Sequence, residues 1–125
     1  MNTPISFELA KLLKEKGFPQ LNQGVYYTKD KEHCLVGWGF NDRSETSFAQ
    51  YSAPIIAEIV MWLYEKHEIW IYPKMSFKII NDESLDSFTP VIERRFEFEI
   101  NNLGEFNSPK EAYESAINYI LNNLI

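Results

Sequence analysis

The stretch from Ile55 to Tyr64 constrains the fold most, because Glu58 is its only polar residue. Ser52 precedes it as a candidate N-cap, and Pro54 suits the first turn of a helix. A helix that is apolar on nearly every side must be covered by the rest of the chain on more than one side. We therefore expect a helix after Ser52 at the centre of the fold.

Two more helices are indicated by their ends. The first helix is predicted over residues 4–16. Thr3 and Ser6 are equally suitable N-caps, and Gly17 is expected to end the helix. Ser108-Pro109-Lys110-Glu111 has the sequence of a capping box with proline in the first turn. The apolar residues after it recur at helical spacing: Tyr113, Ala116, Ile117, Ile120, Leu121 and Leu124.

Four strands are predicted between these helices. Val25–Lys29 and Cys34–Phe40 read as one hairpin, followed by a polar loop over 41–51. Residues 69–80 and 90–101 alternate between apolar and polar positions, which favours two long antiparallel strands with one face on the core. The expected fold class is α+β, in the order α-ββ-α-ββ-α, with three helices packed on a mainly antiparallel four-stranded sheet.

The register of the long hairpin can be predicted from its charges. Placing Lys78 opposite Glu93 and Lys74 opposite Glu97 avoids like charges, and it sets Ile71 against Ile100 on the apolar face. Pro73 has no N–H to donate, so strand 69–80 should be a sheet edge or should bulge at Pro73.

Length and composition bound the class of protein. A chain of 125 residues fits a single domain over 1–125 with a core of its own. Cys34 is the only cysteine, and charged residues interrupt every long apolar run, so we expect a soluble cytoplasmic protein without disulfide or membrane segment. The net charge of −6 disfavours general nucleic-acid binding.

The sequence contains no known catalytic motif such as G-x-S-x-G, H-E-x-x-H or a Walker A loop. His33 and Cys34 are neighbours on a predicted strand and therefore point to opposite faces, which argues against a thiolate pair. Together with His67 they lack the paired spacing of zinc ligands. The sequence thus leans against an enzyme, and we expect no catalytic residue, metal or cofactor.

The most promising candidate binding surface is one face of strand 69–80. Trp70 and Tyr72 precede Lys74 and Lys78 on that face. Aromatic rings interleaved with lysines can stack a planar ligand or anchor a protein partner. The alternative interpretation is that another part of the chain covers the two rings, as it does most large aromatic side chains.

Three stretches carry a resemblance: ELAKLLKEKGF (8–18), YSAPIIAEIVMWLYEKHEIWI (51–71) and FNSPKEAYESAINYIL (106–121). They resemble a group of short uncharacterised proteins encoded in bacterial genomes and their prophages. The resemblance implies an accessory role near mobile elements, such as binding a host or phage protein. The group has no assigned activity, so no functional residue is carried over.

Three hypotheses follow from these observations. The first is a non-enzymatic protein-interaction module of a prophage or mobile-element accessory type, whose partner is another protein or a second copy in a homodimer. The second is a small-molecule-binding domain or minor enzyme with a pocket between the central helix and the sheet. The third is a nucleic-acid-associated protein that uses Lys11, Lys14 and Lys16 of the first helix.

Overall fold

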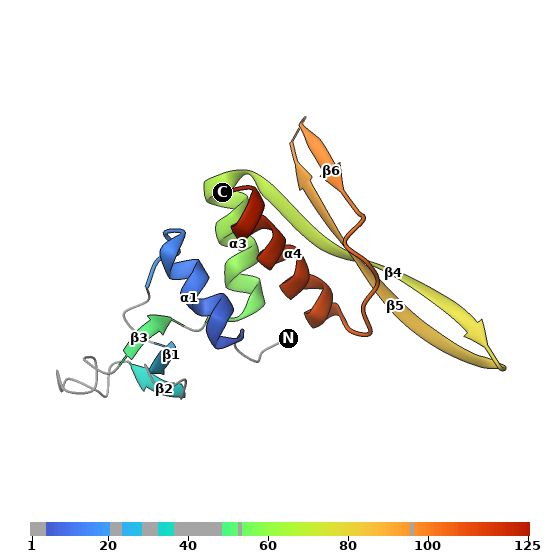
Figure 1. Cartoon of the computed structure of the whole chain (residues 1–125), viewed down its shortest axis with the longest axis horizontal. Coiled ribbons are helices and arrows are strands. Elements are labelled where there is room, and N and C mark those ends of the chain that lie inside the picture. The colour runs from blue at the N-terminus through green and yellow to red at the C-terminus, as the bar shows by residue number, and fades with distance from the viewer. Residues whose placement is uncertain (1–4, 21–23, 29–32, 37–48, 53, 96) are drawn as a thin grey trace. The chain divides into compact units, whose positions relative to one another are not determined.

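The computed structural model describes residues 5–20, 24–28, 33–36, 49–52, 54–95 and 97–125. The chain divides into two compact units, Asn2–Ile55 and Ile56–Ile125. Figure 1 shows helices and antiparallel strands in the chain, so the expected α+β class is confirmed. A single domain over 1–125 stays a prediction.

The unit Asn2–Ile55 begins with α1, Phe7–Glu15. Its N-cap is Ser6, whose hydroxyl oxygen accepts a hydrogen bond from the Leu9 N–H at 3.3 Å. Gly17 ends the helix with φ at 91°, a left-handed conformation in which glycine is the least strained residue. The Phe18 N–H then donates to the Leu13 carbonyl at 2.9 Å, which completes the expected C-terminal stop.

Three strands of this unit form an antiparallel sheet in the order β2-β1-β3. β1 is Gly24–Thr28 and β2 is His33–Val36, and they pair as the first predicted hairpin. The remaining residues predicted for it, 29 and 37–40, lie outside the described residues. β3, Ala49–Ser52, was not predicted. It lies where a loop and the N-cap Ser52 were expected, and this placement was wrong because pairing with β1 satisfies the backbone of this short segment. The rest of the expected loop lies outside the described residues.

The helices of the unit Ile56–Ile125 are α3, Ile56–His67, and α4, Pro109–Asn123. The expected N-cap of α4 is confirmed, because the Glu111 N–H donates to the Ser108 hydroxyl at 3.2 Å. α3 differs from the expectation of a helix covered on several sides. It buries one face, while Met61 and Tyr64 on the other are exposed.

The second sheet has the order β4-β5-β6, formed by Ile69–Ile80, Glu83–Arg94 and Phe98–Ile100. The predicted four-stranded sheet is therefore replaced, in the described residues, by two sheets of three strands. The predicted strand 90–101 was wrong as a single element. Its first part belongs to β5, a turn follows in which the Glu97 N–H donates to the Arg94 carbonyl at 3.0 Å, and its last part is β6.

The predicted hairpin register was also wrong. Lys78 lies opposite Leu85 and Lys74 opposite Thr89, whereas Glu93 and Glu97 had been expected. The cause is the turn Asn81-Asp82, whose φ angles of 53° and 62° are those of a two-residue type I′ turn. A turn fixes the register of a hairpin, whereas opposed charges contribute only about 0.2–1 kcal/mol per pair.

The core of this unit lies where helices cover the sheet. Ile71 and Ile92 are paired and buried, and they define the inner face of the second sheet. α3 packs against β4, and α4 packs against both β4 and β5. The remaining buried apolar side chains of the unit are Ile56, Ile59, Trp62, Leu63, Ile69, Val91, Ala112, Ala116, Ile117, Ile120 and Leu121.

The distal half of the hairpin, residues 74–89, extends beyond these helices, and we call it the arm (Figure 1). Met75, Phe77 and Ile79 continue the inner face along β4 and are 63%, 65% and 70% exposed. We call these three side chains the apolar stripe. Alternate residues of β4 therefore remain apolar beyond the part of the strand, around Ile69 and Ile71, that the helices cover.

The expectation for Pro73 is confirmed, because β4 is an edge strand that pairs with β5 alone in the described residues. Pro73 lies opposite Pro90. Counting alternate pairs from the turn places both prolines at a pair that exchanges no backbone hydrogen bonds. Neither proline therefore removes a bond between β4 and β5.

The turn can be tested by substitution at Asp82. Asp82→Gly should increase the stability of the arm against local opening by up to about 1 kcal/mol, because Asn-Gly is the preferred type I′ pair. Asp82→Val should reduce it by about 1–2 kcal/mol, because a β-branched residue is strained at positive φ. Hydrogen exchange of the arm amides measures both effects. Equal protection in the two variants would contradict the turn assignment.

Candidate functional site

The first candidate surface is an aromatic patch formed by Tyr64 and Trp70. Tyr64 lies in the last turns of α3 and Trp70 is the second residue of β4. Glu68 alone joins the helix to the strand, with φ at 56° and its N–H donating to the Tyr64 carbonyl at 3.2 Å. This reversal places the two rings edge to face with centroids 5.3 Å apart.

Both rings of the aromatic patch are accessible. Trp70 is 42% exposed. The rest of the chain therefore does not cover this ring, contrary to the alternative interpretation of the sequence. Trp70 lies on the outer face of the second sheet, opposite the inner face that carries Ile71. An exposed tryptophan held by a neighbouring ring is a common anchor for protein partners, because it offers a large contact area at little cost in side-chain entropy.

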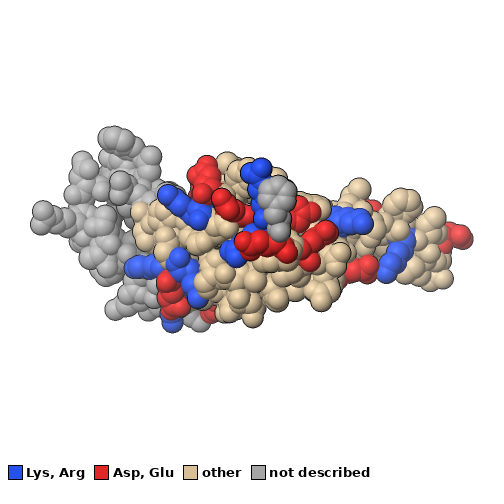
Figure 2. All heavy atoms as spheres, turned by 90° about the horizontal axis from the view of Figure 1, so that it is seen from above, with Lys and Arg blue, Asp and Glu red and all other residues tan. Residues whose placement is uncertain are grey.

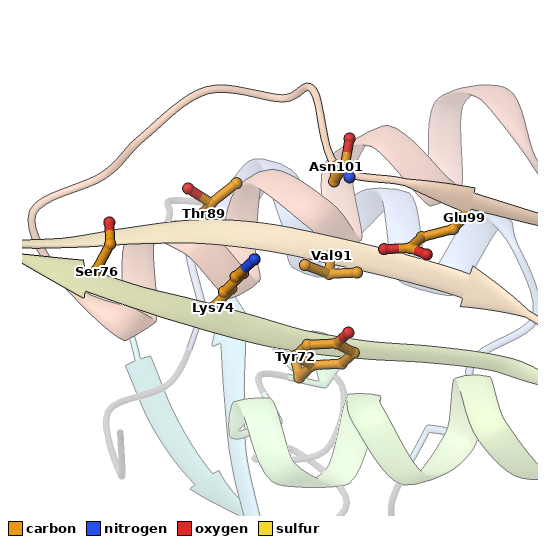
Figure 3. Close-up of a pocket in the computed structure, with 7 residues that line it drawn as sticks. All are labelled: Tyr72, Lys74, Ser76, Thr89, Val91, Glu99 and Asn101. Carbon is orange, nitrogen blue, oxygen red and sulfur yellow. The ribbon is translucent and has the colours of Figure 1, made fainter.

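The second candidate surface is an open depression of about 610 Å³ on the same outer face. Strands β4 and β5 and the chain around the end of β6 supply its lining: Tyr72, Lys74, Ser76, Thr89, Val91, Glu99 and Asn101. Figure 3 shows these side chains on the strands, with Lys74 and Tyr72 from β4 side by side. No helix residue lines the depression, so it differs from the expected pocket between the central helix and the sheet.

The Tyr72 hydroxyl donates a hydrogen bond to a Glu93 carboxylate oxygen at 3.1 Å. This bond raises the pKa of Tyr72 above 10.0, with burial and the negative charges of Glu93 and Glu99 acting in the same direction. The bond also fixes the ring beside the depression. The phenol is therefore a neutral hydrogen-bonding group at neutral pH, with the proton held toward Glu93.

Two of the four residues proposed from sequence come together in the depression, namely Tyr72 and Lys74. Trp70 lies next to them on the outer face but belongs to the aromatic patch. Lys78 lies farther along the arm, where its ammonium pairs with Glu105 at 3.0 Å. The proposed surface is thus divided between the aromatic patch, the depression and the arm.

Sequence reasoning missed the arm as an exposed surface. Figure 2 shows it at the right as a mostly tan stretch with lysines along it and acidic side chains near its tip. The alternation of β4 was interpreted as burial along its whole length, whereas α3 and α4 cover only the proximal part. The Asn81-Asp82 pair was the available signal, because a turn there starts the second strand at Glu83 and changes which residues face β4.

The described residues bring together no catalytic constellation. His67 ends α3, and its ring lies edge-on to Trp62 at 4.9 Å. Burial, and then the positive charge of Arg94, lower its pKa below 6.5. His33 and Cys34 are in β2, and their side chains lie outside the part of the structure that is described. Among the described side chains, no three metal-ligating groups cluster.

The depression offers groups that can hydrogen-bond and stack against a ligand. Its polar groups are hydroxyls, an amide, one ammonium and one carboxylate, and the Tyr72 ring adds an aromatic face. These groups can bind a ligand or a partner.

Comparison with known proteins gives no relative: no family model, no curated protein and no solved structure matches this chain. In the described residues, no helix is long and apolar enough to cross a membrane.

A pair of tryptophan substitutions tests the exposure of the aromatic patch. Trp70→Ala should lower the free energy of unfolding by about 1 kcal/mol, the value of an edge-to-face contact. Trp62→Ala is the matched control; this ring is 8% exposed, and its loss should cost about 3–5 kcal/mol. Denaturant unfolding of both variants provides the values. A loss for Trp70→Ala as large as that for Trp62→Ala would mean that Trp70 is a core residue.

The link between Tyr72 and Glu93 predicts a pH effect. Glu93→Gln should lower the pKa of Tyr72 toward 10.0, because it removes the largest cause of the increase, and Glu99→Gln should lower it less. NMR titration of the Tyr72 ring carbons measures both. A raised pKa means that the folded state prefers the neutral phenol. This stabilisation is present below pH 10 and is lost as the pH rises through the folded-state pKa. An unchanged pKa in Glu93→Gln would contradict the hydrogen bond between Tyr72 and Glu93.

Proposed function

We propose that the chain is a non-enzymatic protein-interaction module. The exposed apolar stripe on the arm carries this proposal. Its side chains are among the most exposed large apolar residues of the described chain, and they lie in a row on one strand face. Clustered apolar exposure of this kind marks interaction sites in folded proteins.

The shape of the arm supports the same function. A two-stranded hairpin is only marginally stable on its own in water, because it has no core on either face. The base of the arm has a third backbone partner, because Phe88 exchanges hydrogen bonds of 2.9 Å with Phe106 in both directions. Beyond it the arm holds a row of exposed apolar residues on two strands, with Lys74 and Lys78 on its outer face. A partner that covers the stripe would supply the missing layer.

The aromatic patch provides a second point of contact. Trp70 is a candidate hot spot because it combines exposure with a fixed ring orientation. The apolar stripe lies on the inner face and Trp70 on the outer face, so a partner that contacted both would pass around the edge of β4. The acidic net charge of −6 favours a partner with a basic surface around its apolar contact area.

The wider setting of the proposal comes from the sequence resemblance. We place the module in the cytoplasm, as an accessory protein of a prophage or another mobile element, with a host or phage protein as its partner. A module whose surface serves for contact with another protein suits such a role.

The depression favours a second candidate function, the binding of a small molecule. Tyr72 offers a ring face and Lys74 a positive charge at the same open site. A planar anionic ligand would match both. Native mass spectrometry of the chain purified from its own cell tests this. A bound small molecule that Lys74→Met releases would favour it over the protein-interaction proposal.

Affinity purification of the tagged full chain from its own cell tests the main proposal. The triple substitution Met75→Ser, Phe77→Ser and Ile79→Ser should remove a co-purifying protein without unfolding the chain, because these side chains are exposed. Met61→Ser, an exposed methionine on α3, is the matched control and should retain the partner. Equal recovery with the triple variant and wild type would contradict the proposal.

Trp70→Ala gives a quantitative test once a partner is in hand. A hot-spot tryptophan should weaken binding by about 2 kcal/mol or more, which is roughly thirtyfold in the dissociation constant. Isothermal titration with purified partner measures the change. An unchanged affinity would restrict the interaction surface to the arm.

A further inference from the structure

The open edge of β4 provides an unused row of hydrogen-bonding groups. In the described residues β4 pairs with β5 alone. Counting alternate pairs from the turn, Ile80 and Glu83 exchange bonds, so Met75, Phe77 and Ile79 direct their N–H and C=O groups away from β5. Pro73 occupies the same kind of position without an N–H. The edge is therefore competent for pairing from Met75 to Ile79.

We propose that this edge pairs with the same edge of a second copy, in antiparallel orientation and centred on Phe77. The inference rests on the proposed function of the arm as an interaction surface and names one partner for it. Phe77 of the two copies would lie opposite each other, with Met75 opposite Ile79 of the second copy. An exposed edge strand that carries apolar residues is a template for such pairing.

Neighbouring registers are less favourable. Centring the pair on Ser76 would set Lys74 opposite Lys78 of the second copy, and centring it on Lys78 would set that residue opposite itself. Like charges directly opposite each other destabilise a sheet. Centring it on Met75 would bring Pro73 into a hydrogen-bonding position where it has no donor. The register centred on Phe77 avoids both defects.

Charge complementarity favours the same register. It sets Lys74 of one copy opposite Ile80 of the other, and Ile80 is paired with Glu83. The tip of the arm therefore offers Asp82 and Glu83, both exposed, close to the incoming lysine. Two-fold symmetry repeats this arrangement at the other end of the interface. The local attraction opposes the repulsion between two chains that each carry a net charge of −6.

The pairing would also join the two apolar stripes. Residues opposite each other in an antiparallel pair share a face, so all six side chains would lie on the inner face of one continuous sheet. Phe88, which is half-buried and opposite Met75, extends this surface on each side. Each side chain of the stripe thus gains a neighbour from the other copy at its side, while the inner face of the joined sheet stays open.

Sedimentation equilibrium of the purified full chain tests the dimer. Wild type should dimerise reversibly, and Phe77→Lys should weaken the dimer at least roughly tenfold, because it places two ammonium groups face to face at the axis. Leu85→Lys is the matched control, since Leu85 is exposed on the arm but lies in β5 on the other face. It should leave the dimer unchanged. A wild type that stays monomeric, or equal weakening by both variants, would overturn the inference.

Disulfide trapping tests the register. In a Cys34→Ser background, chains carrying Met75→Cys are mixed with chains carrying Ile79→Cys and oxidised mildly. A hydrogen-bonded pair separates its Cα atoms by about 5.5 Å, within the disulfide range of roughly 4.4–6.8 Å. Mass spectrometry should find disulfides mainly between the two kinds of chain, and a preference for disulfides within one kind would overturn the register. If wild type is monomeric while the arm variants still lose another protein partner, the self-pairing fails and the proposed function stands.

Discussion

The two-residue turn at Asn81-Asp82 determines most of the second sheet. Its positive φ angles let Ile80 pair with Glu83 directly across the two turn residues. Each residue of β4 therefore has a fixed partner in β5. That pairing places the side chains of Ile71 and Ile92 on the inner face, which the helices cover. The side chains of Trp70 and Tyr72 lie on the outer face. The depression, the open edge of β4 and the position of Pro73 all follow from the same register.

The arm exists because strand pairing extends farther along the hairpin than helix packing does. The helices cover only the proximal part of the hairpin, where burial stabilises the pairing. The turn, however, lies well beyond them, and strand pairing continues to it with the same inward and outward alternation. The apolar residues on the distal part are consequently exposed. Exposed apolar residues on an open strand edge make that edge prone to association.

The sequence predicted local features well when the signal lay within a few residues. The N-cap at Ser108, the stop at Gly17 and the edge role of Pro73 are each determined by one residue's hydrogen-bonding capacity or φ angle. Predictions from the sequence failed where a strand or the exposure of a side chain depended on distant parts of the chain. β3 is defined by its pairing with β1, and the exposure of Met75 depends on how far α3 and α4 extend along the hairpin. For the candidate site, Tyr72 and Lys74 could be proposed from alternation, whereas Glu99 and Asn101 required the position of β6.

NMR of the full chain tests the turn-fixed register most directly. Residues at a non-hydrogen-bonded antiparallel pair bring their Cα hydrogens close together, because their Cα atoms are only about 4.5 Å apart. The structure predicts strong nuclear Overhauser effects between the α-protons of Phe77 and Asp86, and between those of Met75 and Phe88. Effects that instead join Lys74 to Glu97 and Lys78 to Glu93, or that join Ile71 to Ile100, would show that charge pairing sets the register. The arm, its apolar stripe and its open edge would then not exist in this form.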